Sequence, residues 1–233
     1  MNIIDKIYYI NLERRPDRNI HFLNEYEKHN LPKDKLIRFD AIDGIKYNFS
    51  NEEYNMFENV DYKGRHFEKN IMGNQLSHYY ILKEMIEKKY NYIIIFQDDV
   101  IFKKNFFNYI DNLMESIPED SEIINIGLHK DCNYYHFVPW DLNNEYNDDY
   151  EKIGKIKINN HICILHDFIT PCSLGYIVTL KGAINITSFF KEYGFLKATD
   201  YNYNEYLINK NIFYGSTNIL CTGNPSLGSD IFI

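Results

Sequence analysis

The sequence lacks several features that mark well-known classes of protein. It has four cysteines, at positions 132, 163, 172 and 221, which lie far apart and show no paired spacing. This pattern favours reduced thiols over a disulfide framework. No stretch reaches the apolar length needed to cross a bilayer, and an early acidic residue, Asp5, argues against a signal peptide. These absences predict a cytoplasmic protein without a transmembrane segment.

Basic charge is also scarce, with 25 Lys and Arg against 33 Asp and Glu and a formal net charge of -8. A surface that binds nucleic acid is normally basic, so nucleic acid is not an expected partner. The sequence contains no G-x-G-x-x-G, no G-x-x-x-x-G-K and no G-x-S-x-G. A dinucleotide site, a P-loop and a nucleophile elbow are therefore not expected. A nucleotide at a local basic cluster stays compatible with this composition.

The composition that is present is that of a globular protein, with 45% hydrophobic and 25% charged residues. No internal repeat, linker or low-complexity tail interrupts the chain, which predicts a single domain over residues 1–233. Aromatic residues are frequent, with 21 Tyr and 16 Phe. Either they line a groove for sugar rings or they reflect a biased composition.

The most informative stretch covers residues 73–102. Asn74 is the expected N-cap of an amphipathic helix, with Leu76, Tyr79 and Leu82 at helical spacing. Residues 92–96 (YIIIF) form a short apolar run, typical of a strand buried on both faces of a mainly parallel sheet. The polar residues 97–99 follow directly. Ligands of open α/β sheets bind beyond the carboxyl ends of the strands, so a site is expected here.

The rest of the chain reads as alternating strands and helices, which predicts an α/β fold that begins with a parallel βαβ unit. Strands are expected at 6–12, 36–39, 123–127, 155–158, 161–168, 174–180, 212–214 and 219–221, and an apolar pattern resumes at 100–102. Helices are expected at 17–29, 51–57, 106–114, 181–193 and 200–210, with a flap at 46–70 and a long loop at 131–151.

A pair of carboxylates, Asp98 and Asp99, ends the predicted central strand. Ions such as Mg2+ and Mn2+ take carboxylate oxygens and keep positions open for substrate phosphates. One interpretation is therefore a metal ion that bridges a diphosphate. The other is a solvated acidic turn.

Three arginines, Arg14, Arg15 and Arg18, follow the first strand just before a predicted helix. Guanidinium groups and free backbone N–H groups at such a place suit a phosphate. The alternative is a surface cluster that pairs with Glu13 and Asp17. The sequence leaves both interpretations open.

Ser77 and His78 fall near the predicted start of the central helix, where they either face the crevice or serve the structure. Two looser His and Cys groupings lack the paired-cysteine spacing of a structural zinc site, so zinc is not expected. These groupings are His129, Cys132 and His136, and His161, Cys163 and His166.

Taken in order, these motifs resemble glycosyltransferase family 25, which includes lipooligosaccharide and collagen galactosyltransferases. The resemblance is carried by residues 10–18 (INLERRPDR), 39–44 (FDAIDG), 73–78 (GNQLSH), 98–99 (DD), 174–183 (LGYIVTLKGA), 199–200 (TD) and 229–230 (SD). It covers nearly the whole chain, with weak stretches at 46–70 and 130–170.

The resemblance implies a GT-A-like α/β/α sandwich with a mostly parallel central sheet. It also implies transfer of a galactose- or glucose-type hexose from a UDP-sugar, with Mn2+ or Mg2+ and with inversion, to a hydroxyl of a glycan or protein acceptor. Carried over by position, it assigns metal ligation to Asp99, Asp98 and Asp230, donor binding to Asn11, Leu12, Arg14, Arg15, Arg18, Ser77, Gln97 and Asp98, and catalysis to Asp200 and His78. The family's leading Glu is Gln97 here, which predicts weaker binding of the metal ion.

Inversion requires a base within hydrogen-bond reach of the acceptor hydroxyl. Asp200, next to Thr199 at a predicted helix start, is the candidate, and its alternative role is that of a helix N-cap. Two rival functions remain: a non-catalytic protein that binds a nucleotide sugar or glycan, and a nucleotidyltransferase with paired acids and a metal. Release of UDP from a donor identifies the transferase, and release of pyrophosphate identifies the nucleotidyltransferase.

Overall fold

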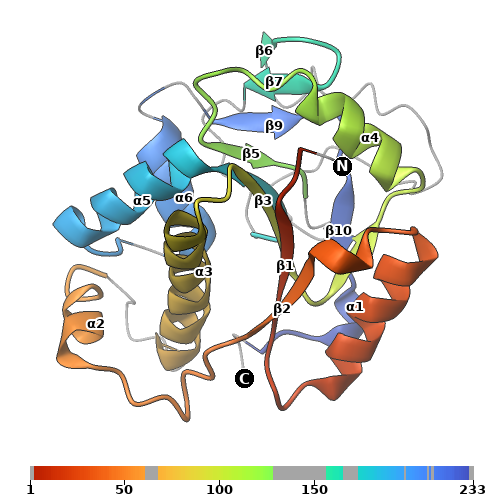
Figure 1. Ribbon diagram of the computed structural model, residues 1–233. Helices are drawn as coiled ribbons and strands as arrows, with labels where there is room; N and C mark the ends of the chain where they lie inside the picture. Colours follow the sequence, from red (N-terminus) through yellow and green to blue (C-terminus); the bar gives the residue numbers. More distant parts are fainter. Residues whose placement is uncertain are drawn as a thin grey trace.

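The computed structural model describes residues 3–60, 68–127, 156–164, 173–196, 198–208, 210 and 213–230. The predicted loop at 131–151 and the residues His129, Cys132, His136, His166 and Cys172 lie outside these ranges. The described strands form one large sheet and one small one (Figure 1). In spatial order the large sheet runs β2 (Leu36–Asp40), β1 (Lys6–Asn11), β3 (Tyr92–Gln97), β8 (Gly175–Thr179), β5 (Ile123–Asn125), β9 (Tyr214–Ser216), β7 (Ile162–Ile164) and β6 (Ile156–Lys157).

Most strands of the large sheet run in the same direction, as predicted. β1 pairs in parallel with both β2 and β3, which confirms that the sheet begins with a parallel unit. β8 runs antiparallel between β3 and β5, and β7 runs antiparallel to β9. The small sheet pairs β4 (Val100–Phe102) antiparallel with β10 (Cys221–Gly223).

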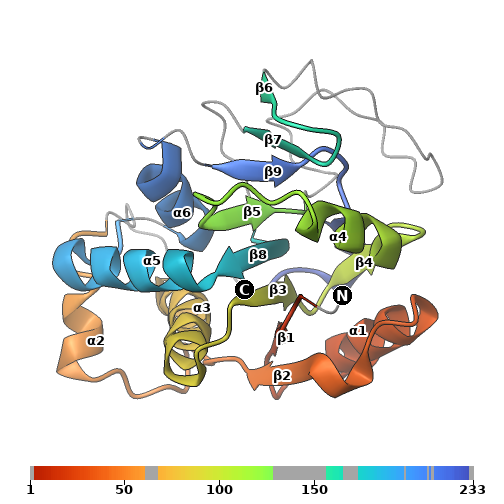
Figure 2. The same cartoon turned by 45° about the horizontal axis from the view of Figure 1, so that its top comes forward.

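Helices cover both faces of the large sheet, giving the predicted α/β/α layers (Figure 2). They are α1 (Pro16–Lys28), α2 (Asn51–Asn55), α3 (Glu68–Lys88), α4 (Phe106–Met114), α5 (Leu180–Tyr193) and α6 (Thr199–Ile208). Among them, α3, α5 and α6 pack on one face, and α1 and α4 pack on the other.

The strand period of two divides the apolar side chains between the two faces. Along β1, Tyr8 and Ile10 join the core under α3, whereas Ile7 and Tyr9 join the core under α1. The ring of Tyr9 stacks on Phe22 of α1 with centroids 4.1 Å apart. Each such side chain contributes roughly 1.5–3 kcal/mol when fully buried. The central strands are therefore fixed from both sides.

The start of the central helix differs from the prediction. α3 already includes Glu68, so Asn74 lies inside the helix and its assignment as the N-cap is wrong. The Asn74 side-chain oxygen instead accepts a hydrogen bond of 3.0 Å from the hydroxyl of Thr199, the first residue of α6. Asn74, which the sequence indicates as an N-cap, therefore links α3 to α6.

Gly73 lets the loop after β2 lie directly against α3. A Cβ atom at this position would come within 2.3 Å of the carbonyl oxygen of Ile42, which is closer than atoms can approach. One turn later, the Ser77 hydroxyl accepts from the backbone N–H of Ile42 at 2.9 Å and donates to the carbonyl of Gly73 at 2.7 Å. The glycine and the serine together fix residues 42–44 on the helix.

Candidate functional site

The predicted site at the carboxyl end of β3 has two parts, one on each face of the sheet. The amide nitrogen of Gln97 is 2.9 Å from Nε2 of His78 on α3. The carboxylate of Asp98, the next residue, binds Arg18 on α1. Gln97 and Asp98 are consecutive residues, whose Cα atoms lie about 3.8 Å apart, so the backbone between them joins the two parts of the site.

The first part is a cluster of three arginines around two carboxylates. Arg14 and Arg15 leave the turn after β1 and bind Asp230, Arg14 at 2.5 Å. Arg18 binds Asp98 at 2.7 Å and lies 3.4 Å from Asp99. The predicted residues thus come together, although Asp230 is distant in sequence from the arginines. Of the alternative pairing with Glu13 and Asp17 that the sequence left open, the structure has Arg15 with Asp17 at 2.7 Å. Pairing with Asp98 and Asp230 was not indicated by the sequence.

The backbone near Asp230 is held by the same arginines. Arg15 donates to the carbonyl of Leu227 at 2.8 Å, and Arg18 donates to the carbonyl of Gly228. Both acceptors are backbone carbonyls, so these contacts hold the backbone of residues 227–228 in place. The chain after β10 is therefore fixed against the turn between β1 and α1.

Asp98 is buried among its partners. Its carboxylate accepts hydrogen bonds of 2.7 Å from both Arg18 and the amide of Asn11. Burial raises the pKa of Asp98, while the charge of Arg18 and the bond from Asn11 oppose that rise. Asn11 itself also donates to the carbonyl of Arg15 and accepts from Arg38, and the carbonyl of Leu12 accepts from the backbone N–H of Arg15. These contacts shape the turn that presents the arginines.

Two of the three carboxylates predicted to bind Mn2+ or Mg2+, those of Asp98 and Asp230, are held by arginines in this arrangement. The oxygens of Asp98 and Asp230 bind guanidinium groups, which carry the same sign of charge as the ion. Within the described ranges, His, Cys, Asp and Glu side chains form no group of three that could hold a metal ion. The assignment of Asp98, Asp99 and Asp230 to a metal stays a prediction.

The second part of the site is a small pocket on the α3 side of the sheet. It is lined by Ile123, Asn125, Ser173, Tyr176, Asp200, Tyr203 and Phe213. Asp200 lies in the first turn of α6, one residue after the helix begins, so it is not the N-cap. Asp200 is half-buried among the residues that line the pocket, and its role as the base stays a prediction.

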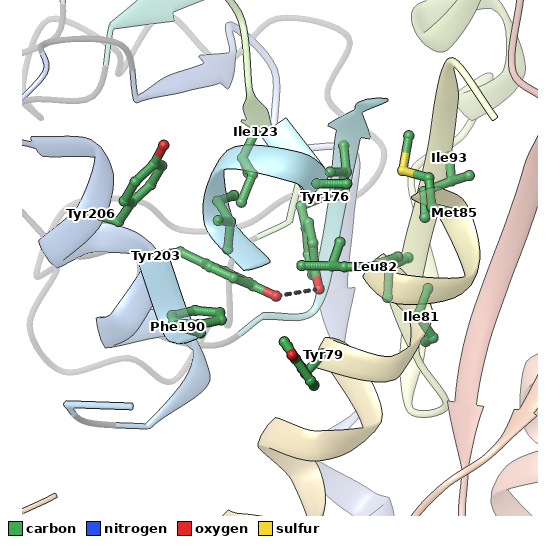
Figure 3. Close-up of a cluster of buried hydrophobic side chains, with 14 of the residues drawn as sticks. Tyr79, Ile81, Leu82, Met85, Ile93, Ile123, Tyr176, Phe190, Tyr203 and Tyr206 are labelled. Carbon is green, nitrogen blue, oxygen red and sulfur yellow. Dashed lines mark hydrogen bonds between the residues drawn. The ribbon is translucent and has the colours of Figure 1, made fainter. Parts of the chain in front are cut away.

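Two tyrosines of this pocket were not predicted from the sequence. The hydroxyls of Tyr176 in β8 and Tyr203 in α6 are 3.2 Å apart, and Figure 3 shows them facing each other beside Tyr79 and Phe190. Burial raises the pKa of both tyrosines. Tyr176 lies within one of the motifs of the family resemblance, but nothing local in the sequence indicated its partner.

His78 lies behind the pocket and is almost completely buried. Its Nδ1 is 2.5 Å from the Tyr176 hydroxyl, and its Nε2 also lies 3.4 Å from the Ser173 hydroxyl. Burial lowers the pKa of His78 from 6.5 to about 3, so the imidazole is neutral at pH 7. His78 contacts residues that line the pocket, which supports a positioning role over direct catalysis.

Ser77, predicted to bind the donor, is fully buried, and its hydroxyl bonds the loop after β2 and the helix backbone. This placement supports a role in fixing residues 42–44. It does not support a direct contact between Ser77 and a ligand.

Comparison with known proteins gives a consistent set of relatives. The family Glycosyltransferase family 25 (LPS biosynthesis protein) matches residues 4–203. "Probable inactive glycosyltransferase 25 family member 3" of Bos taurus is 28% identical over 59% of this chain and 21% of its own length. "Procollagen galactosyltransferase 2" of Homo sapiens is 30% identical over 53% of this chain and 20% of its own length. The chain thus corresponds to about a fifth of these curated relatives.

A solved structure also matches. It is the galactosyltransferase LgtC in complex with donor and acceptor sugar analogs, at 8% identity and a TM-score of 0.42, over 94% of this chain and 87% of that chain. Among the described helices of the present structure, none has both the length and the apolar character needed to cross a membrane.

Proposed function

Because the chain belongs to glycosyltransferase family 25 (LPS biosynthesis protein), we propose that it transfers a hexose of the galactose or glucose type from a UDP-sugar. The acceptor is a hydroxyl group of a glycan or of a glycosylated protein, and the anomeric carbon is inverted. The observation that carries the proposal is the junction at Gln97 and Asp98. It joins an arginine cluster on one face of the sheet to a pocket with a carboxylate on the other.

The arginine cluster is suited to the diphosphate of the donor. Arg14 and Arg15 both bind the carboxylate of Asp230, and planar guanidinium groups bind phosphate with the same geometry. When UDP leaves, negative charge develops on its β-phosphate. Fixed positive groups beside that phosphate stabilise the charge in the transition state. Arg14, whose side chain is 31% exposed, is accessible to an incoming ligand.

The pocket is suited to the sugar and to the acceptor hydroxyl. Asp200 serves as the base that takes the proton of the acceptor as the new bond forms. Aromatic walls from Tyr176, Tyr203 and Phe213 offer apolar surfaces to a sugar ring.

Whether the proposed transfer depends on Mn2+ or Mg2+ is a question for experiment. Because the described carboxylates bind arginines, no step of the reaction is assigned to a metal ion. Asp99 lies 3.4 Å from the guanidinium group of Arg18, farther than Asp98, which lies 2.7 Å from it. Binding of UDP with and without Mn2+, in the parent and in Asp99→Asn, measures the metal dependence directly.

The test of function is release of UDP. The protein is incubated with UDP-galactose or UDP-glucose and a set of glycan acceptors, and UDP is measured. We expect acceptor-dependent release from one of the two donors. Asp200→Asn should abolish release and retain binding of UDP, whereas Asp34→Asn, on a short 3-10 turn outside the site, should have the parent's activity.

A second function is favoured by one observation, which is that a relative of this chain is named as probably inactive. The rival is a non-catalytic protein that binds a nucleotide sugar. Tight binding of UDP-sugars without release of UDP for any acceptor would support that rival and contradict the transferase. Release of pyrophosphate from a nucleoside triphosphate would contradict both.

A further inference from the structure

Four side chains form a continuous hydrogen-bonded chain from the end of β3 to the pocket. The amide nitrogen of Gln97 is 2.9 Å from Nε2 of His78, and Nδ1 of His78 is 2.5 Å from the hydroxyl of Tyr176. The Tyr176 hydroxyl is 3.2 Å from the hydroxyl of Tyr203 (Figure 3). His78, Tyr176 and Tyr203 are each less than 5% exposed. Water therefore has little access to the hydrogen bonds between these three side chains.

The chemistry of the first member fixes the direction of every bond in the chain. An amide nitrogen only donates, so Nε2 of His78 must accept. A neutral imidazole has one donor and one acceptor nitrogen, so Nδ1 carries the proton and donates to Tyr176. The buried Tyr176 hydroxyl contacts His78 and Tyr203, and because it accepts from His78, the Tyr203 oxygen is left to accept its proton. The proton of the Tyr203 hydroxyl remains available for a further acceptor.

We propose that Gln97, His78 and Tyr176 are positioning residues that make Tyr203 a hydrogen-bond donor toward the hexose of the sugar nucleotide. The proposal rests on the proposed function for the identity of that ligand. The direction of the chain itself rests only on the contacts described above. Tyr176 and Tyr203 both line the pocket that contains Asp200.

Burial raises the pKa of both tyrosines, so both hydroxyls keep their protons at pH 7 and each is able to donate a hydrogen bond.

A carboxylate in place of the amide reverses the chain. In Gln97→Glu the carboxylate only accepts, so Nε2 of His78 carries a proton, and burial, which disfavours a charged imidazole, leaves Nδ1 without one. Nδ1 then accepts from Tyr176, and Tyr176 accepts from Tyr203. The proton of Tyr203 is used within the chain, and Tyr203 offers only a lone pair to the pocket. The residue at position 97 therefore determines whether the Tyr203 hydroxyl donates or accepts a hydrogen bond in the pocket, although it does not touch Tyr203.

The direction of the chain is tested by nitrogen NMR of protein labelled with 15N-histidine, because the two tautomers have different spectra. The His78 signals are identified by their loss in His78→Gln. We expect a proton on Nδ1 in the parent and on Nε2 in Gln97→Glu. Tyr203→Phe should keep the parent tautomer, because the direction is set at the Gln97 end. A proton on Nε2 in the parent, or no change of tautomer in Gln97→Glu, would overturn the proposed direction of the hydrogen bonds.

The contact with the hexose is tested by calorimetry with UDP-galactose, UDP-glucose and UDP. Tyr203→Phe should weaken binding of the preferred UDP-hexose by about 2- to 10-fold, the effect of one neutral hydrogen bond, and leave UDP unchanged. Equal affinities for that UDP-hexose in parent and variant, or an equal loss for UDP, would refute the contact. If no UDP-sugar bound the parent, the proposed function would fail together with the assignment to the hexose, while the NMR result would still decide the direction of the chain.

Discussion

Gln97 and Asp98 are neighbours in the chain, but their side chains are bonded on opposite faces of the central sheet. The amide of Gln97 is directed to His78 on α3, and the carboxylate of Asp98 is directed to Arg18 on α1. Alternation of side chains along a strand requires this separation. Two consecutive polar residues of one motif therefore serve two different environments. Gln97 belongs to the hydrogen-bonded pocket, and Asp98 belongs to the arginine cluster.

Substitution of Gly73 by alanine should destabilise the protein. Alanine is the better helix former by about 1 kcal/mol, so an exposed site would gain stability. Here a Cβ would lie 2.3 Å from the carbonyl of Ile42, and the loop or the helix must move. We expect a net loss of about 1–3 kcal/mol in the free energy of unfolding, measured by urea denaturation.

The matched control is Glu87→Ala, on the exposed side of the same helix. Its effect should stay within about 0.5 kcal/mol. A Gly73→Ala protein as stable as the parent would show that residues 42–44 are not held against α3.

The elements and the general position of the site could be predicted because they depend on local patterns. The apolar run of β3 and the polar residues after it define where the strand ends. The start of α3 could not be predicted in this way, because Gly73 and Asn74 resemble helix-breaking and capping residues. Their true roles, close contact with Ile42 and a bond to Thr199, depend on distant parts of the chain.

The partners within the site were unpredictable for the same reason. Arg14 and Asp230 are 216 residues apart in the sequence, and His78 and Tyr176 are 98 residues apart. The sequence indicates which residue types are present at each end of such a pair. Only the fold determines that acidic residues expected to bind a metal ion pair with the arginines expected to bind phosphate.

The buried histidine predicts that stability decreases in mild acid. The folded pKa of His78 is about 3, below the ordinary value of 6.5. Between these two values the unfolded chain binds a proton that the folded protein excludes. The stability contributed by this group is therefore complete above about pH 6.5 and is lost as the pH falls toward 3, by about 1.4 kcal/mol per pH unit.

This dependence is measured by urea denaturation at several pH values in the parent and in His78→Gln. The variant is expected to be less stable at pH 7 but to have a shallower dependence below pH 6.5. Equal slopes in the two proteins would mean that His78 is protonated in the folded state, which the surrounding hydrogen bonds do not allow.

Arg15→Ala should weaken the binding of UDP. A charge-assisted hydrogen bond to phosphate is worth about 1.5–3 kcal/mol, which corresponds to roughly a 10- to 150-fold loss of affinity. Lys88→Ala, which removes an exposed cation from the end of α3, should have almost no effect. Calorimetry with UDP measures both, and similar affinities for the two variants would disprove the role of the arginine cluster.

Asp230 allows the strongest test, because its two possible roles predict opposite results. Its carboxylate binds Arg14 and Arg15, the groups proposed for the diphosphate, so it competes with the donor as an internal anion. Asp230→Asn removes the charge and frees the guanidinium groups. Without a metal ion we expect UDP to bind more tightly, by about tenfold, which is about 1.4 kcal/mol. Asp17→Asn is the matched control, because Asp17 also binds Arg15 but is 53% exposed and well solvated. Weaker binding of UDP by Asp230→Asn only when Mn2+ is present would instead identify Asp230 as the metal ligand that the sequence predicts.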